Sequence, residues 1–137
     1  MSKAIWIAVA VIAAIAVITA IVRMQAPKRP PIGSAEADAQ TLRALQEAGA
    51  DLTKETEVNF YLYFPIRDLA SRAAESDHMP GFTATVEQGA DRKTWLCLIS
   101  GIMVPSEVAI RANSVRLQAL ASSLGGEYDG WEAAVTK

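Results

Sequence analysis

The chain has 137 residues, and its formal net charge is only −2. All fifteen Asp and Glu residues follow residue 34, but only nine of the thirteen Lys and Arg residues do, so the later part carries a formal charge of −6. This acidity argues against binding to a nucleic-acid backbone and is compatible with a basic protein partner, and the single cysteine excludes an internal disulfide.

The first predicted element is an apolar span that runs from Ala4 to Val22. Its nineteen residues carry no charge, and as a helix they would extend about 28 Å, close to the hydrocarbon thickness of a bilayer. The sequence therefore predicts that residues 1–23 are a transmembrane anchor that contacts the lipid bilayer through residues 4–22. A cleaved signal peptide is the alternative.

The charges that flank this span predict its orientation. Lys3 precedes it, whereas Arg23, Lys28 and Arg29 follow it. The positive-inside rule then predicts a single-pass protein of the inner (cytoplasmic) membrane, with its C-terminal domain in the cytoplasm. Several prolines in residues 24–34 predict a stiff linker that is not helical.

The predicted domain occupies residues 35–137 and begins with a helix. Ser34 is the expected N-cap, and Glu36 and Asp38 lie in the first turn, where the helix dipole favours carboxylates. The helix is expected to end near Ala48, with Gly49 after its C-terminus.

Two later stretches are predicted to be central strands. In residues 56–64, apolar side chains alternate with Asn59, Tyr61 and Tyr63, and residues 94–102 are apolar on both faces. Residues 82–87 alternate between apolar and polar side chains, as expected of an edge strand.

Helices are predicted between these strands and after them. The first covers residues 66–76, and a longer one follows the N-cap Ser106 and ends at Gly125 and Gly126. The apolar stripe of the longer helix is expected to contain Val108, Ile110, Val115, Leu117, Leu120 and Leu124. A short last strand is expected near residues 131–135.

The order strand, helix, strand, strand, helix, strand predicts an α+β fold of the ferredoxin-like, split βαβ type, with a four-stranded antiparallel sheet. One transmembrane helix and one extra helix would precede this domain. The first and third strands should be central, which agrees with their apolar character. One sheet face should carry the two later helices, and the other would be covered by the first helix or left open for binding.

Several short motifs, spread over residues 40–135, resemble the RraB family of regulators of ribonuclease E activity. They are Ala48-Gly49-Ala50-Asp51-Leu52, Val58-Asn59-Phe60-Tyr61-Leu62-Tyr63-Phe64-Pro65, Gly81-Phe82, Trp95-Leu96, Met103-Val104-Pro105 and Gly126-Glu127-Tyr128-Asp129-Gly130-Trp131-Glu132. The resemblance implies a ferredoxin-like domain without catalysis of its own. It also implies binding to ribonuclease E, chiefly to its non-catalytic scaffold region, and slower RNA turnover.

The last of these motifs supplies the candidate protein-binding residues, Glu127, Tyr128, Asp129, Trp131 and Glu132. The three carboxylates are expected to engage basic segments of an RNase E-like scaffold. Tyr128 and Trp131 would anchor the contact if they are exposed, and which of the two faces outward stays open.

Other chemistry is not expected. One histidine and one cysteine cannot form a tetrahedral zinc site, and no phosphate-binding motif is present, so we expect neither a metal nor a cofactor. Tyr61 and Tyr63 could imitate the stacking platform of an RNA-binding domain, but the acidic charge argues against direct nucleic-acid binding. The sequence thus predicts a membrane-anchored, non-enzymatic regulator. The alternatives are a small-ligand sensor and a structural accessory module of a membrane complex.

Overall fold

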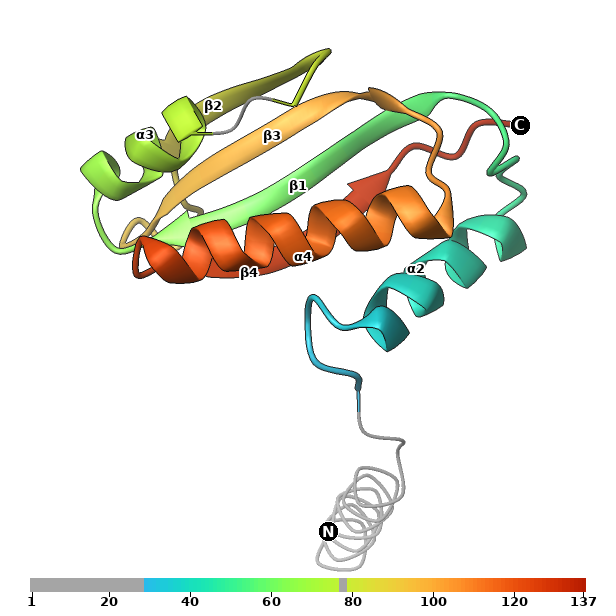
Figure 1. Ribbon diagram of the computed structural model, residues 1–137, viewed down its shortest axis with the longest axis horizontal. Helices are drawn as coiled ribbons and strands as arrows, with labels where there is room; N and C mark the ends of the chain where they lie inside the picture. Colours follow the sequence, from blue (N-terminus) through green and yellow to red (C-terminus); the bar gives the residue numbers. More distant parts are fainter. Residues whose placement is uncertain (1–28, 77–78) are drawn as a thin grey trace, which may run out of the picture.

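The computed structural model describes residues 29–76 and 79–137, which form one antiparallel sheet and three helices (Figure 1). In chain order the elements are α2 (Ala35–Glu47), β1 (Thr56–Phe64), α3 (Arg67–Ser76), β2 (Phe82–Gln88), β3 (Trp95–Met103), α4 (Glu107–Ser123) and β4 (Glu127–Ala133).

The four strands lie in the order β2-β3-β1-β4. The crossover through α3 joins β1 to β2 with β3 between them, and the crossover through α4 joins β3 to β4 with β1 between them. This arrangement is two interlocked split βαβ units. The predicted α+β class, the four-stranded antiparallel sheet and the central position of the first and third strands are therefore confirmed.

The transmembrane part of the prediction needs correction. The span predicted at residues 4–22, bounded by Ala4 and Val22, and residues 24–28 of the predicted linker lie outside the described residues. Of the helices that the structure describes, none is both long enough and apolar enough to cross a bilayer. The transmembrane helix is therefore not part of the fold that residues 29–76 and 79–137 form, and no described helix supports the predicted single-pass location in the inner membrane.

The helix ends follow the predicted capping chemistry. The Ala37 amide donates to Ser34 Oγ at 3.1 Å, and the Ala109 amide donates to Ser106 Oγ at 3.2 Å, so both serines are N-caps. Gly49 has a φ of 95°, the left-handed conformation that glycine adopts after a helix.

The core lies between one face of the sheet and the helices, and we call this side of the sheet the covered face. Phe60, Leu62 and Phe64 of β1 point into it and are almost completely buried. Small and branched side chains of α3 and α4 pack against them: Ala70, Ala73, Ile110, Leu117 and Ala121. Figure 1 shows both helices on the same side of the sheet, with α2 beside α4.

The buried side of α4 differs from the predicted apolar stripe. Ile110, Leu117 and Ala121 are buried, whereas Val108 and Val115 are 82% and 55% exposed. The buried positions follow the helical spacing of three and four residues. Val108 and Val115 lie on the opposite side of the helix. The prediction placed them on the buried side because it relied on their hydrophobicity alone.

The last strand begins at Glu127, earlier than predicted, and contains a β-bulge. Tyr128 pairs with Leu62 and Trp131 pairs with Phe60, so β4 has one residue more than β1 between these pairs. Gly130 lies within the bulge with a φ of 96°. In a regular strand, residues three apart point to opposite faces. The extra residue turns both aromatic side chains toward the covered face.

Candidate functional site

The face of the sheet opposite the helices is the candidate site, and we call it the open face. The strand registers place fourteen residues on it: Glu57, Asn59, Tyr61, Tyr63, Thr83, Thr85, Glu87, Leu96, Leu98, Ser100, Ile102, Glu127, Asp129 and Glu132. Five of these residues carry a carboxylate, and none is Lys or Arg. The face is therefore acidic, with carboxylates on three of its four strands and most of them on β4.

Apolar and aromatic side chains lie along the centre of the open face. Tyr61 pairs with Leu98, and Tyr63 pairs with Leu96, across the two central strands. Ile102, farther along β3, is 57% exposed. The centre of the face thus offers contact area, since aromatic rings add rigid apolar surface with a polar tip.

The predicted binding residues of β4 divide between the two faces. Glu127, Asp129 and Glu132 are exposed on the open face. Tyr128 and Trp131 are only 7% and 9% exposed and belong to the core. The condition under which these two aromatics would anchor a partner is not met, because the bulge turns both of them inward. The sequence leaves open which of the two faces outward, and in the structure neither does.

Tyr61 of β1 forms a hydrogen bond with the outer strand β4. Its hydroxyl donates to Glu132 Oε1, and Asn59 Nδ2 lies 3.4 Å from the same oxygen. Burial, with the Glu132 carboxylate as the second cause, raises the pKa of Tyr61 to about 12. The phenol therefore stays neutral, and the negative charge at this position belongs to Glu132.

A hollow of about 350 Å³ lies at one end of the open face. Its lining includes the Tyr63 ring and the carboxylates of Asp91, Glu127 and Asp129. Burial raises the pKa of Tyr63, and the charges of Asp129 and Asp91 act in the same direction. The surroundings of this tyrosine are thus negative, which disfavours anionic ligands and favours cationic ones.

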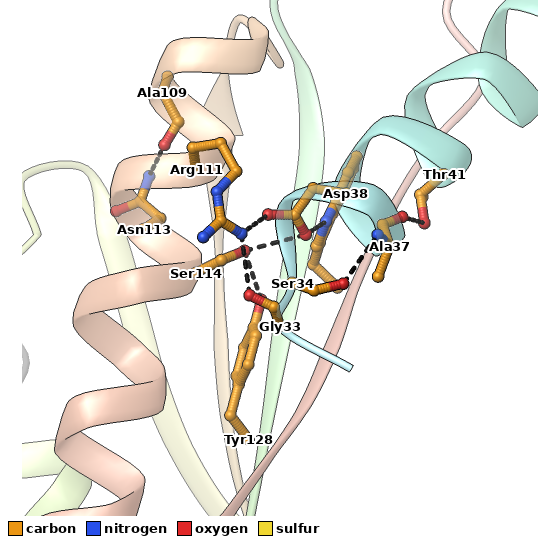
Figure 2. A network of polar contacts seen from close by, with 11 residues as sticks. Gly33, Ser34, Ala37, Asp38, Thr41, Ala109, Arg111, Asn113, Ser114 and Tyr128 are labelled. Carbon is orange, nitrogen blue, oxygen red and sulfur yellow. Dashed lines mark hydrogen bonds and ion pairs between the residues drawn. The ribbon is translucent and has the colours of Figure 1, made fainter. Parts of the chain in front are cut away.

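On the other side of the sheet, a buried carboxylate joins three elements (Figure 2). Asp38 of α2 is 2% exposed. Its Oδ2 accepts from Arg111 Nη1 at 2.7 Å, and its Oδ1 accepts from Ser114 Oγ at 3.1 Å and from Trp131 Nε1 at 3.0 Å. The Tyr128 hydroxyl lies 3.1 Å from Ser114 Oγ. We call these five residues the Asp38 cluster.

The Asp38 cluster explains the two aromatics of the closing motif. Trp131 Nε1 and the Tyr128 hydroxyl are polar groups that need partners when their rings are buried, and the cluster supplies them. Sequence reasoning placed Asp38 in the first turn of a helix, which is correct, but it assigned the carboxylate only to the helix dipole. No local signal marks Asp38 as a buried acceptor, because its partners lie on α4 and β4.

The described residues show little that suggests catalysis. Within residues 29–76 and 79–137, no group of three or more His, Cys, Asp and Glu side chains is placed to hold a metal ion. Cys97 is buried on the covered face. Hydrogen bonds from Thr53 lower the pKa of Asp51, and those from the Thr94 and Lys93 amides lower the pKa of Asp91, but both carboxylates stabilise surface turns.

Comparison with known proteins identifies one family. Residues 35–133 match the model described as RraB, Regulator of ribonuclease activity B. The matched range runs from the first residue of α2 to the last residue of β4. A search of curated proteins found no match to this chain.

Proposed function

We propose a function on the premise that the chain belongs to the RraB family, the regulators of ribonuclease activity. The domain acts by binding rather than by catalysis. Its open face engages a basic segment of an RNase E-like ribonuclease, in the non-catalytic scaffold region of that enzyme, and this contact lowers the rate of RNA cleavage.

The charge of the open face is the observation that carries this proposal. Three of its five carboxylates, Glu127, Asp129 and Glu132, lie on the outer strand β4, where they are exposed. A scaffold segment rich in Lys and Arg complements this charge, which speeds association and disfavours wrong partners. Each exposed ion pair contributes only about 0.2–1 kcal/mol, so the apolar centre of the face must supply much of the affinity.

The same charge argues against direct competition for RNA. The face has the stacking residues Tyr61 and Tyr63 but no cation to hold a phosphate. A regulator that binds the ribonuclease itself fits this surface better than one that covers the transcript.

A charge-reversal experiment tests the proposal. The full-length chain is titrated into a cleavage assay with an RNase E-like enzyme that includes its scaffold region, at several salt concentrations. We expect slower cleavage and a weaker effect at higher salt, because exposed charges are screened. The open-face variant carries three substitutions: Glu127→Lys, Asp129→Lys and Glu132→Lys.

The matched control changes the net charge by the same amount at three exposed helix positions: Glu47→Lys, Glu75→Lys and Glu107→Lys. The open-face variant should need at least about tenfold more protein for the same inhibition, which corresponds to about 1.4 kcal/mol, while the control should act like the original protein. Equal losses in both variants would show that only the net charge matters and would contradict the assignment of the open face. Circular dichroism checks that both variants remain folded.

A further inference from the structure

We infer that the partner segment docks on the open face as an amphipathic helix, with an apolar stripe over the two central strands and its basic residues along one flank, above β4. The inference rests on the proposed function and specifies the conformation of the partner.

The apolar part of the docking surface runs along β1 and β3. Tyr61 and Leu98 face each other across these strands and are half-buried, and Ile102 of β3 is 57% exposed. An apolar stripe of the partner that covers them would remove these side chains from water.

The acidic part of the surface lies mainly to one side. Beyond β1, the outer strand β4 contributes Glu127, Asp129 and Glu132. Beyond β3, the other outer strand contributes Thr83, Thr85 and a single carboxylate, Glu87. Because neighbouring strands are about 4.8 Å apart, a helix over the centre would bring only one flank over the three carboxylates of β4.

A helix suits this surface better than an extended segment. An extended chain on the face of a sheet would place its own N–H and C=O groups against Leu98 and Ile102, which offer no hydrogen bonds. A helix satisfies these groups internally and exposes only side chains. The covered face of the same sheet already packs two helices, α3 and α4, so its twist suits such a layer.

Two synthetic peptides of identical composition test the partner's conformation against the full-length chain. In the first, leucines recur at helical spacing with arginines along one flank, and in the second the same residues are scrambled so that no stripe forms. We expect calorimetry to show that the first peptide binds at least about tenfold more tightly, since burial of a few apolar side chains contributes more than 1.4 kcal/mol. Equal affinity would overturn the inference, because the face would then recognise charge alone.

A pair of protein variants locates the contact. Ile102→Asp adds a charge at the apolar centre of the open face, and Val115→Asp adds one on the solvent side of α4, at nearly the same exposure of 57% and 55%. We expect Ile102→Asp to weaken binding of the first peptide about tenfold and Val115→Asp to leave it unchanged. The opposite result would place the docking surface on α4 and reject the inference.

The outcomes separate this inference from the proposed function. If the open-face charge variant loses inhibition but the two peptides bind equally, the function stands and the helical partner is rejected. If the first peptide binds as expected but the chain does not inhibit the ribonuclease, the helix-binding surface stands and its assignment to ribonuclease control fails. Binding of a short RNA to the chain in the absence of any peptide would show that the chain accepts nucleic acid, which would overturn both.

Discussion

The carboxylates on the two sides of the sheet differ in burial and in hydrogen bonding. On the covered face, Asp38 is buried and accepts hydrogen bonds from Arg111, Ser114 and Trp131. On the open face, the carboxylates of β4 are exposed and share their face with no Lys or Arg. A buried charge must be paired to be tolerated, whereas an exposed charge can remain available to another molecule. The covered face therefore holds the fold together, and the open face is suited to binding.

Substitution of Asp38 should produce the largest effect on stability. Asp38→Ala removes the acceptor for Trp131 Nε1 and Ser114 Oγ, which would remain buried, and the partner of Arg111, which can still reach water. We expect the free energy of unfolding to fall by about 3 kcal/mol. Urea denaturation followed by circular dichroism measures this change.

Two neighbouring variants sharpen the comparison. Glu36→Ala lies in the same helical turn but is exposed, so it should change the free energy of unfolding by no more than about 0.5 kcal/mol. Asp38→Asn keeps one acceptor oxygen and should fall between the two alanine variants. An Asp38→Ala variant as stable as Glu36→Ala would show that the cluster contributes no net stability.

The sequence predicts the sheet better than it predicts the site. The alternation in residues 56–64, the serine caps and the glycine stops are local signals, and the structure confirms each of them. The Asp38 cluster depends on contacts between Asp38 and residues 76 and 93 positions away, which no local pattern encodes.

Residues 126–132 show why the side-chain directions in the last strand could not be predicted by alternation. Gly130 inside a strand is a possible bulge signal, but a bulge is defined only by the register against β1. The structure supplies that register, and with it the reason why Tyr128 and Trp131 share one face while Glu127, Asp129 and Glu132 are exposed.

Tyr128 should make the protein sensitive to alkaline pH. Burial raises its pKa from 10 in the unfolded chain to about 12 in the fold. Below pH 10 the phenol is neutral in both states, and between pH 10 and 12 only the unfolded chain loses the proton, so stability falls as the pH rises. Two pH units correspond to about 2.7 kcal/mol. Urea denaturation from pH 9 to 12 should show this loss.

Tyr128→Phe provides the reference for that measurement. The variant cannot ionise at this position. Over the same pH range, the fall in its free energy of unfolding should therefore be about 2–3 kcal/mol smaller than the fall in the original protein. Near pH 7 it should be about 1 kcal/mol less stable, because the contact with Ser114 is lost. Parallel curves for the two proteins would show that other groups cause the alkaline loss.

Tyr61→Phe should have the smallest effect, although the pKa of Tyr61 also rises to about 12. Its hydroxyl bonds to Glu132 on the open face, where water can replace the lost partner, so we expect a loss of less than about 1 kcal/mol at neutral pH. Because Tyr61 is only partly buried, solvent screens the charge of its phenolate and weakens this linkage, so the stability curve of the variant between pH 10 and 12 should stay closer to that of the original protein than the curve of Tyr128→Phe. A loss as large as that of Tyr128→Phe would mean that the polar groups of the open face also hold the fold together. The variant also leaves the Glu132 carboxylate without its phenol donor, so a basic peptide should bind at least as tightly as before.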